Sequence, residues 1–433
     1  MKLEYSLEET PPPGTSLVLG FQWAFIAIST IVILGKIVSA IHFGQSQDEI
    51  LYLQKLFFLT GATLIFQVLW GHRLPLISGP AAVLLIGIVS SRSYGISVIN
   101  TAIMIGGAFV SVLAVTGLFS YVRKLFTARV IAVVLLLIVF TLAPTIRDLM
   151  IGFSGGIDPL WNVTFAIFLA FGMFLLDRIL SGIWKTGLIV FSMLIGSVVY
   201  FLIFPASLSS HLFTHESWMQ FFFENMTVHP VIVPGVLVSF LICYIALTVN
   251  DLGSIQSLNE MLDPEHKNRR INRGVILTGI SNIASGFMGV LGPVNYALSP
   301  GVIASTRCAS RYPLIVAGFF VLLLSPFPRL IGWLGCVPSV VVGGVMVYIM
   351  ASQIAAGLQF AVREARNGEF SFDSGIIIGL PVLLGNIISF LPAEVLEKAP
   401  DMFRPVLGNG FVAGVFSALF LEHIIYKKAV DSR

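Results

Sequence analysis

The chain has 433 residues, of which 56% are hydrophobic and only 11% are charged, and its formal net charge is +3. Soluble domains carry about 25% charged residues, so this composition excludes a largely soluble protein. The mean hydropathy of +0.93 predicts an all-α, polytopic membrane protein.

Stretches of about 20 apolar residues, the length that a helix needs to cross a bilayer, recur along the whole chain. In chain order we predict spans near residues 17–40, 51–70, 94–119, 128–150, 159–181, 186–204, 230–250, 271–290, 312–332, 336–358, 373–392 and 404–426. Two shorter apolar segments, 74–91 and 295–307, bring the prediction to fourteen transmembrane segments.

The two shorter segments are interrupted by glycine and proline, at Gly79-Pro80 and at Pro300-Gly301. Residues 74–78 and 292–299 precede them and are rich in Gly, Pro and Ser, which predicts short extended stretches before broken helices 3 and 10. Interrupted segments in corresponding positions of two halves indicate a transporter's binding site. Amide groups at their helix N-termini can face a ligand, because broken backbone in lipid survives only around a cavity.

A division near residues 178–185 gives seven segments on each side, and odd halves insert with opposite orientations. The sequence therefore predicts a 7+7 inverted repeat. Its predicted parts are a cytoplasmic tail at 1–16, a first repeat at 17–182 closed by a seventh span at 183–204, an extracellular loop at 205–229, a second repeat at 230–426 and a cytoplasmic tail at 427–433.

Basic residues gather in alternate loops, whereas the predicted outer loop 205–229 has no Lys or Arg. This positive-inside pattern places both termini in the cytoplasm of a cell membrane protein. The cluster Lys267, Arg269, Arg270 and Arg273 fits this topology signal better than a nucleic-acid patch. The three cysteines lie in or beside apolar spans, and we interpret them as small packed residues rather than a disulfide set or metal site.

Polar side chains inside apolar spans are expensive and often mark function. Asp251 is the clearest case, either as a substrate acceptor and proton carrier or as a carboxylate at a helix end near the interface. Gln22 either reads a polar ligand or joins two spans, and Asn295 either binds ligand or satisfies freed backbone groups. Trp23 can stack on a flat ligand or pack, and Lys36 is expected to snorkel to the outer surface.

The chain resembles the nucleobase–ascorbate transporter family, also called nucleobase:cation symporter-2, which includes uracil and xanthine permeases. The resemblance covers nearly the whole length, from the Gly-Phe-Gln start of the first span at residues 20–22 to Gly343-Gly344. The family signature reads Gln/Glu-Asn-x-Gly, four residues, then Thr-Arg/Lys. Gly301, Thr306 and Arg307 match it in spacing.

The resemblance implies a core domain that holds substrate between spans one, three, eight and ten, and a gate domain against which it moves. Backbone amides near Ala82 and Ser299 would donate to a uracil-like ring, and Asn250 or Asp251 would accept its N–H groups. Gln22, Trp23, Gly79 and Asn295 complete the candidate set. The chain departs from the family pattern at Leu298, Ser299 and Asn250, where the family has Gln or Glu, Asn and Glu respectively.

The sequence therefore predicts a permease that moves a nucleobase such as uracil or xanthine, by proton symport with alternating access. Asp251 is the candidate for proton coupling. The alternative is a sulfate- or bicarbonate-like anion transporter on the same fold, since Leu298 removes an acid. A channel or scaffold is a third class. We expect no enzyme activity, no cofactor other than a coupling ion and no nucleic-acid partner; the expected partners are the small-molecule substrate, the lipid bilayer and a second copy in a homodimer.

Overall fold

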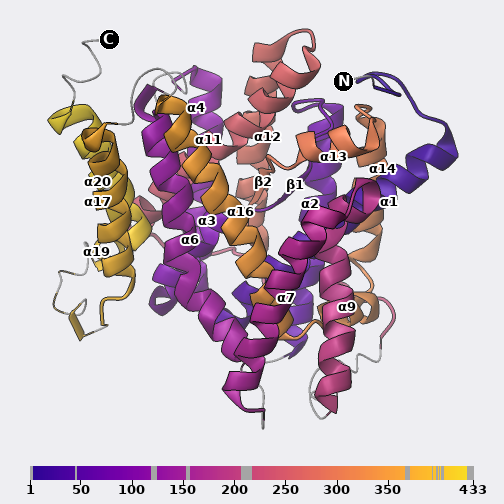
Figure 1. The fold of residues 1–433 in the computed structure, drawn as a ribbon, viewed down its shortest axis with the longest axis horizontal. Helices are drawn as coiled ribbons and strands as arrows, with labels where there is room; N and C mark the ends of the chain where they lie inside the picture. Colours follow the sequence, from indigo (N-terminus) through magenta and orange to yellow (C-terminus); the bar gives the residue numbers. More distant parts are fainter. Residues whose placement is uncertain are drawn as a thin grey trace.

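The computed structural model describes residues 3–43, 46–118, 124–152, 157–205, 217–365, 371–392, 394–395, 398, 400 and 404–426 (Figure 1). Its elements, in chain order, are α1 (Pro13–His42), α2 (Ser46–Leu69), β1 (Ser78–Pro80), α3 (Ala82–Ser90), the 3-10 turn η1 (Arg92–Tyr94), α4 (Ile96–Thr116), α6 (Ala128–Ile151), α7 (Pro159–Ile179), α8 (Gly182–Thr186), α9 (Leu188–Ile203), α11 (Pro234–Leu262), α12 (Lys267–Met288), β2 (Pro293–Asn295), α13 (Ser299–Thr306), α14 (Tyr312–Leu324), α15 (Pro328–Gly335), α16 (Ser339–Ala365), α17 (Phe372–Ser389), α19 (Arg404–Leu407), α20 (Gly410–Phe420) and the π-helical turn η3 (Leu421–Ile425).

Helix starts follow local sequence signals. Helices α1, α7, α11, α13, α14 and α15 carry proline in their first two positions, where the missing N–H would have no intrahelical partner. Side chains cap three others: Thr127 accepts from the amide of Val130, Ser371 from that of Ser374, and Asn409 from that of Val412. These caps satisfy amides that the first helical turn leaves without a carbonyl.

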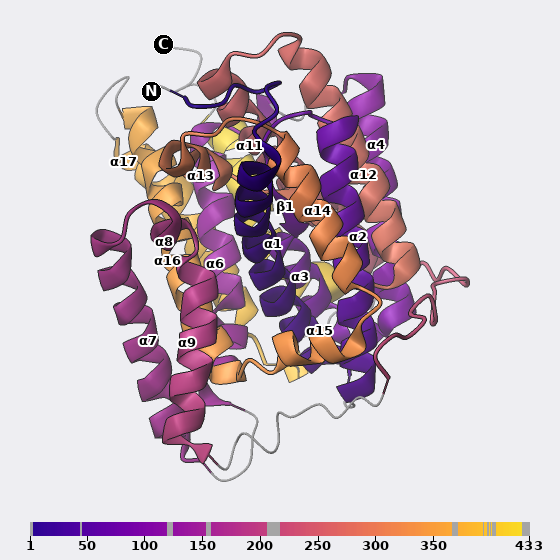
Figure 2. The ribbon, with the colours of Figure 1, turned by 90° about the vertical axis from the view of Figure 1, so that its right-hand side faces the viewer.

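The helices form two groups. The first contains α1, α2, α3, α4, α11, α12, α13 and α14, and the second contains α6, α7, α9, α16, α17 and α20. Figure 2 shows α1, α2, α4, α12 and α14 together on one side and α6, α7, α9 and α16 on the other. The strands β1 and β2 lie inside the first group and pair with each other.

Glycine pairs allow close approach between helices of the first group. A Cβ on Gly107 of α4 would lie 2.7 Å from the carbonyl oxygen of Gly279 on α12. A Cβ on Gly61 of α2 would lie 2.8 Å from the carbonyl oxygen of Gly318 on α14. Small residues at such crossings let helix backbones pack closely. In lipid, where the hydrophobic effect does not drive helices together, this van der Waals packing stabilises their association.

Each of the fourteen predicted segments contains helix, and the extended stretches predicted before α3 and α13 are confirmed as β1 and β2. Within the described residues, eight helices are long and apolar enough to cross a membrane, or nine if the pair α14 and α15 is one span. Fourteen crossings therefore remain a prediction. The predicted tail 427–433 and residues 206–216 of the predicted outer loop lie outside the described residues.

Two predicted boundaries are wrong. The segment 312–332 is not one straight span, because α14 and α15 meet at 103° across a turn that contains Pro326 and Pro328, which cannot donate backbone hydrogen bonds. The eighth span does not end near residue 250, because α11 continues to Leu262. It stops only where Asp263 adopts a left-handed conformation with φ 45°, just before Pro264.

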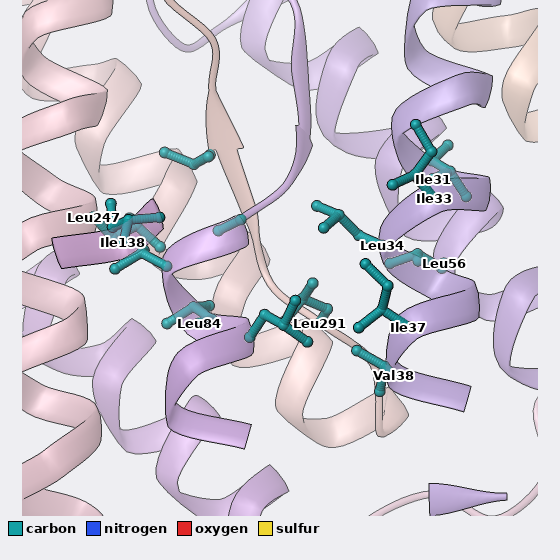
Figure 3. Close-up of a cluster of buried hydrophobic side chains, with 14 of the residues drawn as sticks. Ile31, Ile33, Leu34, Ile37, Val38, Leu56, Leu84, Ile138, Leu247 and Leu291 are labelled. Carbon is teal, nitrogen blue, oxygen red and sulfur yellow. The ribbon is translucent and has the colours of Figure 1, made fainter. Parts of the chain in front are cut away.

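Apolar packing holds the strands and the two helix groups together. Figure 3 shows Leu291, which precedes β2, between Leu84 of α3 on one side and side chains of α1 such as Ile37 on the other. It also shows Ile138 of α6 beside Leu247 of α11, where the two groups meet.

Lys36 does not extend freely to the outer surface as expected. Its Nζ donates a 2.6 Å hydrogen bond to the carbonyl oxygen of Val337, in the segment that leads into α16. This bond joins α1 of the first group to the second group.

Candidate functional site

Two short strands cross at the centre of the first helix group. β1 and β2 are antiparallel, with Ser78 opposite Asn295 and Pro80 opposite Pro293. The amide of Tyr296 donates to the carbonyl of Ile77, and that of Ala81 donates to the carbonyl of Gly292, both at 2.9 Å. Since α3 follows β1 and α13 follows β2, both short helices begin beside this crossing.

Asp251 fixes the second strand. Its Oδ1 accepts from the backbone amide of Asn295 at 3.0 Å and from the Nδ2 of Asn295 at 2.7 Å. Both residues are completely buried, and the hydroxyl of Thr278 also lies next to the carboxyl group. Asp251 thus is buried inside the continuous helix α11 and does not lie at a helix end.

Asn295 extends this network to both strands. Its Oδ1 accepts from the hydroxyl of Ser78, and its carbonyl oxygen accepts from the hydroxyl of Ser254 at 3.0 Å. Asn282 fixes the start of β2, because its Nδ2 donates to the carbonyl of Pro293 at 2.9 Å. Several buried hydrogen bonds of this kind act together to hold a strand in one position.

Ser299 joins the other arm of the crossing. Its hydroxyl accepts from the amide of Ile77 at 3.1 Å, and the side chain is completely buried. Gly79 is required by close packing, since a Cβ there would lie 2.7 Å from the hydroxyl of Tyr296 and 3.0 Å from that of Thr30. The Tyr296 hydroxyl in turn donates to the carbonyl of Pro80 at 2.7 Å.

An open face adjoins the crossing. Asn250 and Gly253 of α11 are exposed, as are Gly301 of α13 and Leu298, which is 39% exposed. A Cβ on Gly253 or Gly301 would meet no atom within 4 Å. Since α11 and α13 contact each other, this face presents the Asn250 amide and the Leu298 side chain to open space, and we name it the α11–α13 face.

The predicted site residues therefore divide into three sets. Asn250 and Leu298 lie on the α11–α13 face, and partly buried Ala82 begins α3. Asp251, Asn295, Ser299 and Gly79 build the crossing behind it. Gln22 and Trp23 are buried on α1 at 8% and 4% exposure, and Trp23 belongs to the apolar core.

Sequence reasoning missed several residues of the network: Ser78, Ser254, Thr278 and Asn282. One signal was available. Thr278, Asn282 and Ser285 recur at helical spacing in α12, so they share one face of the helix. Within the described residues, no group of three or more His, Cys, Asp or Glu side chains is placed to hold a metal ion.

Known proteins are similar to this chain in sequence and in fold. A family model described as "Permease family", for xanthine and uracil permeases, matches residues 14–394. The xanthine permease of Bacillus subtilis (strain 168) is 23% identical over 95% of this chain and 94% of its own length. The nucleobase transporter PlUacP of Paenibacillus larvae is 23% identical over 94% of each chain.

Among solved structures, the transmembrane domain of the cyanobacterial bicarbonate transporter BicA has a similar fold. Its TM-score is 0.60 at 15% identity, over 87% of this chain and 96% of BicA's. The apolar helices make the chain a multi-pass membrane protein, and its match to a permease family indicates a transporter rather than an enzyme. The chain belongs to the xanthine and uracil permease family, the nucleobase:cation symporter-2 family.

Proposed function

We propose that this protein carries a nucleobase across the cell membrane as a secondary transporter. The observation that carries the proposal is the strand crossing, where α3 and α13 begin beside an open face that presents Asn250. Relatives named xanthine permease, uric acid permease and nucleobase transporter support the substrate class. Uracil and xanthine are both flat rings with alternating N–H and C=O groups.

The bound ring lies against the α11–α13 face in this proposal. The amides of Ala82 and Ser299 are the first in α3 and α13 and precede the hydrogen bonds of each helix, so in this proposal they donate to ring carbonyls. The side-chain oxygen of Asn250 accepts from a ring N–H, and Leu298 covers an apolar edge. A substrate analogue that lacks one of these polar groups would leave a buried partner unpaired, which discriminates strongly against it.

A 7+7 inverted repeat is supported by reciprocal packing. The fourth segment (α4) packs on the ninth (α12), and the second (α2) packs on the eleventh (α14), through the two glycine pairs. An inverted repeat maps each of these pairs onto the other. We assign the first helix group as the core domain and the second as the gate domain, with both termini cytoplasmic in the cell membrane. A homodimer remains part of this proposal, and cross-linking in membranes tests it.

The proposal includes coupling of transport to a proton at Asp251. The carboxyl group is buried and holds Asn295, one strand away from α13. Protonation would weaken two charge-assisted hydrogen bonds at once, and this would change how firmly β2 is held. Proton uptake and substrate binding are linked in this way without direct contact between Asp251 and the ring.

Counterflow in proteoliposomes tests the function. Vesicles that contain the purified protein and unlabelled xanthine should accumulate labelled xanthine, with uracil and uric acid tested as competitors. Sulfate and bicarbonate are the competitors that the anion-transporter alternative predicts. Competition by these anions together with no effect of any nucleobase would reject the proposal.

A matched pair of variants places the substrate. Asn250→Ala should lower xanthine affinity about tenfold, the effect of losing one hydrogen bond to a buried polar group. Asn268→Ala is the control, because Asn268 is an exposed asparagine at the start of α12. Equal transport by both variants would remove Asn250 from the binding site.

A further inference from the structure

The N-terminal segment lies as a strap along residues 307–311, directly after α13. The amide of Glu4 donates to the carbonyl of Arg307 at 2.8 Å, and that of Ala309 donates to the carbonyl of Tyr5 at 2.9 Å. Farther along, the hydroxyl of Ser310 donates to the carbonyl of Glu9 at 2.7 Å. We call residues 3–11 the N-terminal strap.

Three guanidinium groups converge on one carboxylate of this strap, that of Glu8. Arg311 donates to Glu8 Oε2 from Nε at 3.0 Å and from Nη2 at 2.7 Å. Arg270 Nη2 donates to Glu8 Oε1 at 3.3 Å, and Arg73 Nη2 lies 3.8 Å from Oε2. Partial burial alone would raise the pKa of the Glu8 carboxyl, but Arg311, Arg270 and Arg73 outweigh it and lower that pKa.

The arginines are held in place by main-chain oxygens rather than by further acids. Arg311 Nη1 donates to the carbonyl of Val68 at 2.7 Å, and Arg270 Nη1 donates to that of Arg73 at 2.7 Å. The side chain of Arg311 is only 7% exposed and that of Arg270 only 13%. Three positive charges therefore face one negative charge in a preformed arrangement, and mutual repulsion between the guanidinium groups remains.

Arg73 shows that the arrangement has unused capacity. Among the described residues its guanidinium donates no hydrogen bond, and its buried Nε has no partner. Its backbone is held in the left-handed region with φ 55°, in the segment that joins α2 to β1. A ligand with more oxygen atoms and more negative charge than one carboxylate would satisfy this cluster better.

We propose that Arg73, Arg270 and Arg311 form a binding site for a phosphate group, which Glu8 occupies in this conformation. A phosphate monoester offers three acceptor oxygens and a charge near −2, which match three guanidinium groups. Three residues before Arg73, exposed Trp70 lies under the guanidinium group of Arg273, 5.5 Å from the ring centre. Tryptophan is typical of the membrane–water interface. The phosphate therefore comes either from a lipid headgroup or from a free phosphate in the cytoplasm.

Displacement of Glu8 would release the strap from residues 307–311, which follow the half-helix of the candidate transport site. The phosphate site takes Arg73 from the segment that leads into β1 and Arg311 from the segment that follows α13. Its occupancy is thus linked to that transport site, although binding of phosphate does not depend on the identity of the transported substrate.

Glu8→Gln tests the proposal, because it removes the competing charge and leaves the arginines intact. The full-length protein is purified in detergent and titrated with inorganic phosphate, against chloride at equal ionic strength, while binding and thermal unfolding are measured. The variant should bind phosphate at least about tenfold more tightly than the unmodified protein, and phosphate should restore its melting temperature. Glu9→Gln is the matched control, since Glu9 bonds only Ser6 within the strap through its side chain among the described residues.

The lipid source is tested in nanodiscs of phosphatidylcholine with and without phosphatidic acid. Stabilisation of Glu8→Gln by phosphatidic acid alone assigns a headgroup, and stabilisation by inorganic phosphate assigns a soluble ligand. Adding Arg73→Gln should abolish either effect. The proposal is overturned if Glu8→Gln responds to neither probe, responds no more than Glu9→Gln, or keeps its response without Arg73. If Glu8→Gln does not fold, Arg73→Gln alone must remove the phosphate binding of the unmodified protein, and unchanged or absent binding overturns the proposal.

Discussion

Replacing the neighbouring residues Asn250 and Asp251 should have different effects: loss of transport for Asn250 and loss of stability for Asp251. Asp251 accepts two hydrogen bonds from Asn295 inside the protein, whereas Asn250 is exposed on the α11–α13 face. Asp251→Asn keeps an acceptor but loses the charge, so each bond weakens by about 1 kcal/mol and the protein loses about 2 kcal/mol of stability. Asp251→Ala leaves two buried donors of Asn295 unpaired and should cost about 3–5 kcal/mol.

Thermal unfolding in detergent and xanthine uptake in proteoliposomes separate the two roles. Asn250→Ala should stay within about 0.5 kcal/mol of the unmodified protein, as surface substitutions usually do, while its uptake falls. For Asp251→Ala, the main effect should be a loss of stability, seen as a lower melting temperature. A fully stable Asp251→Ala variant would refute the reasoning about the strand crossing, and an Asp251→Asn variant whose transport keeps its full pH dependence would reject Asp251 as the coupling group.

Three further predictions follow from other contacts. Gly79→Ala should destabilise the protein by about 1–3 kcal/mol through overpacking against Tyr296. Gly253→Ala is the control: its Cβ meets open space, so its stability should stay within about 1 kcal/mol of that of the unmodified protein. Equal melting temperatures of the two variants would contradict the close approach at Gly79. Lys36→Met removes the hydrogen bond to Val337 and should favour opening between α1 and α16. In a background that lacks the other two cysteines, a membrane-impermeant maleimide should then label half-buried Cys336 faster. Unchanged labelling would mean that this bond does not hold the two groups together. The arginine side chains hold the pKa of the Glu8 carboxyl below its usual 4.5, so the charge of Glu8 stabilises the protein fully above that pH, and this stabilisation is lost as the pH falls through the lowered pKa. The difference in melting temperature between the unmodified protein and Glu8→Gln should therefore shrink as the pH falls below 4.5. A difference that persists in acid would show that the charge is not its cause.

Much of the architecture was readable from the sequence because lipid imposes simple rules. Apolar length located the helices, and proline with glycine located both interruptions beside β1 and β2. The same rules misplaced the end of α11, because polar residues after Asp251 resemble a helix end although nothing in them breaks a helix. They also missed the bend at Pro326, since apolar residues continue on both sides of it.

The candidate site was harder to predict, because its contacts join residues far apart in the chain. Asp251 and Asn295 were each recognised as buried polar residues, but no periodicity indicates that they bond to each other. Glu8 lies in a polar tail with no helical pattern, and its arginine partners come from three separate segments. The charge of Arg270 was interpreted as part of a topology signal, which predicts a side of the membrane and not a contact.

The ladder between β1 and β2 limits how the protein can move. Ser78 and Asn295 are paired in the ladder and joined by a side-chain hydrogen bond. A shift of α3 would therefore displace α13, and a shift of α13 would displace α3. A substrate held between α3 and α13 would move together with both helices. Access to it would then be closed at the boundary between the first and second helix groups, and not by α3 and α13 separating from each other.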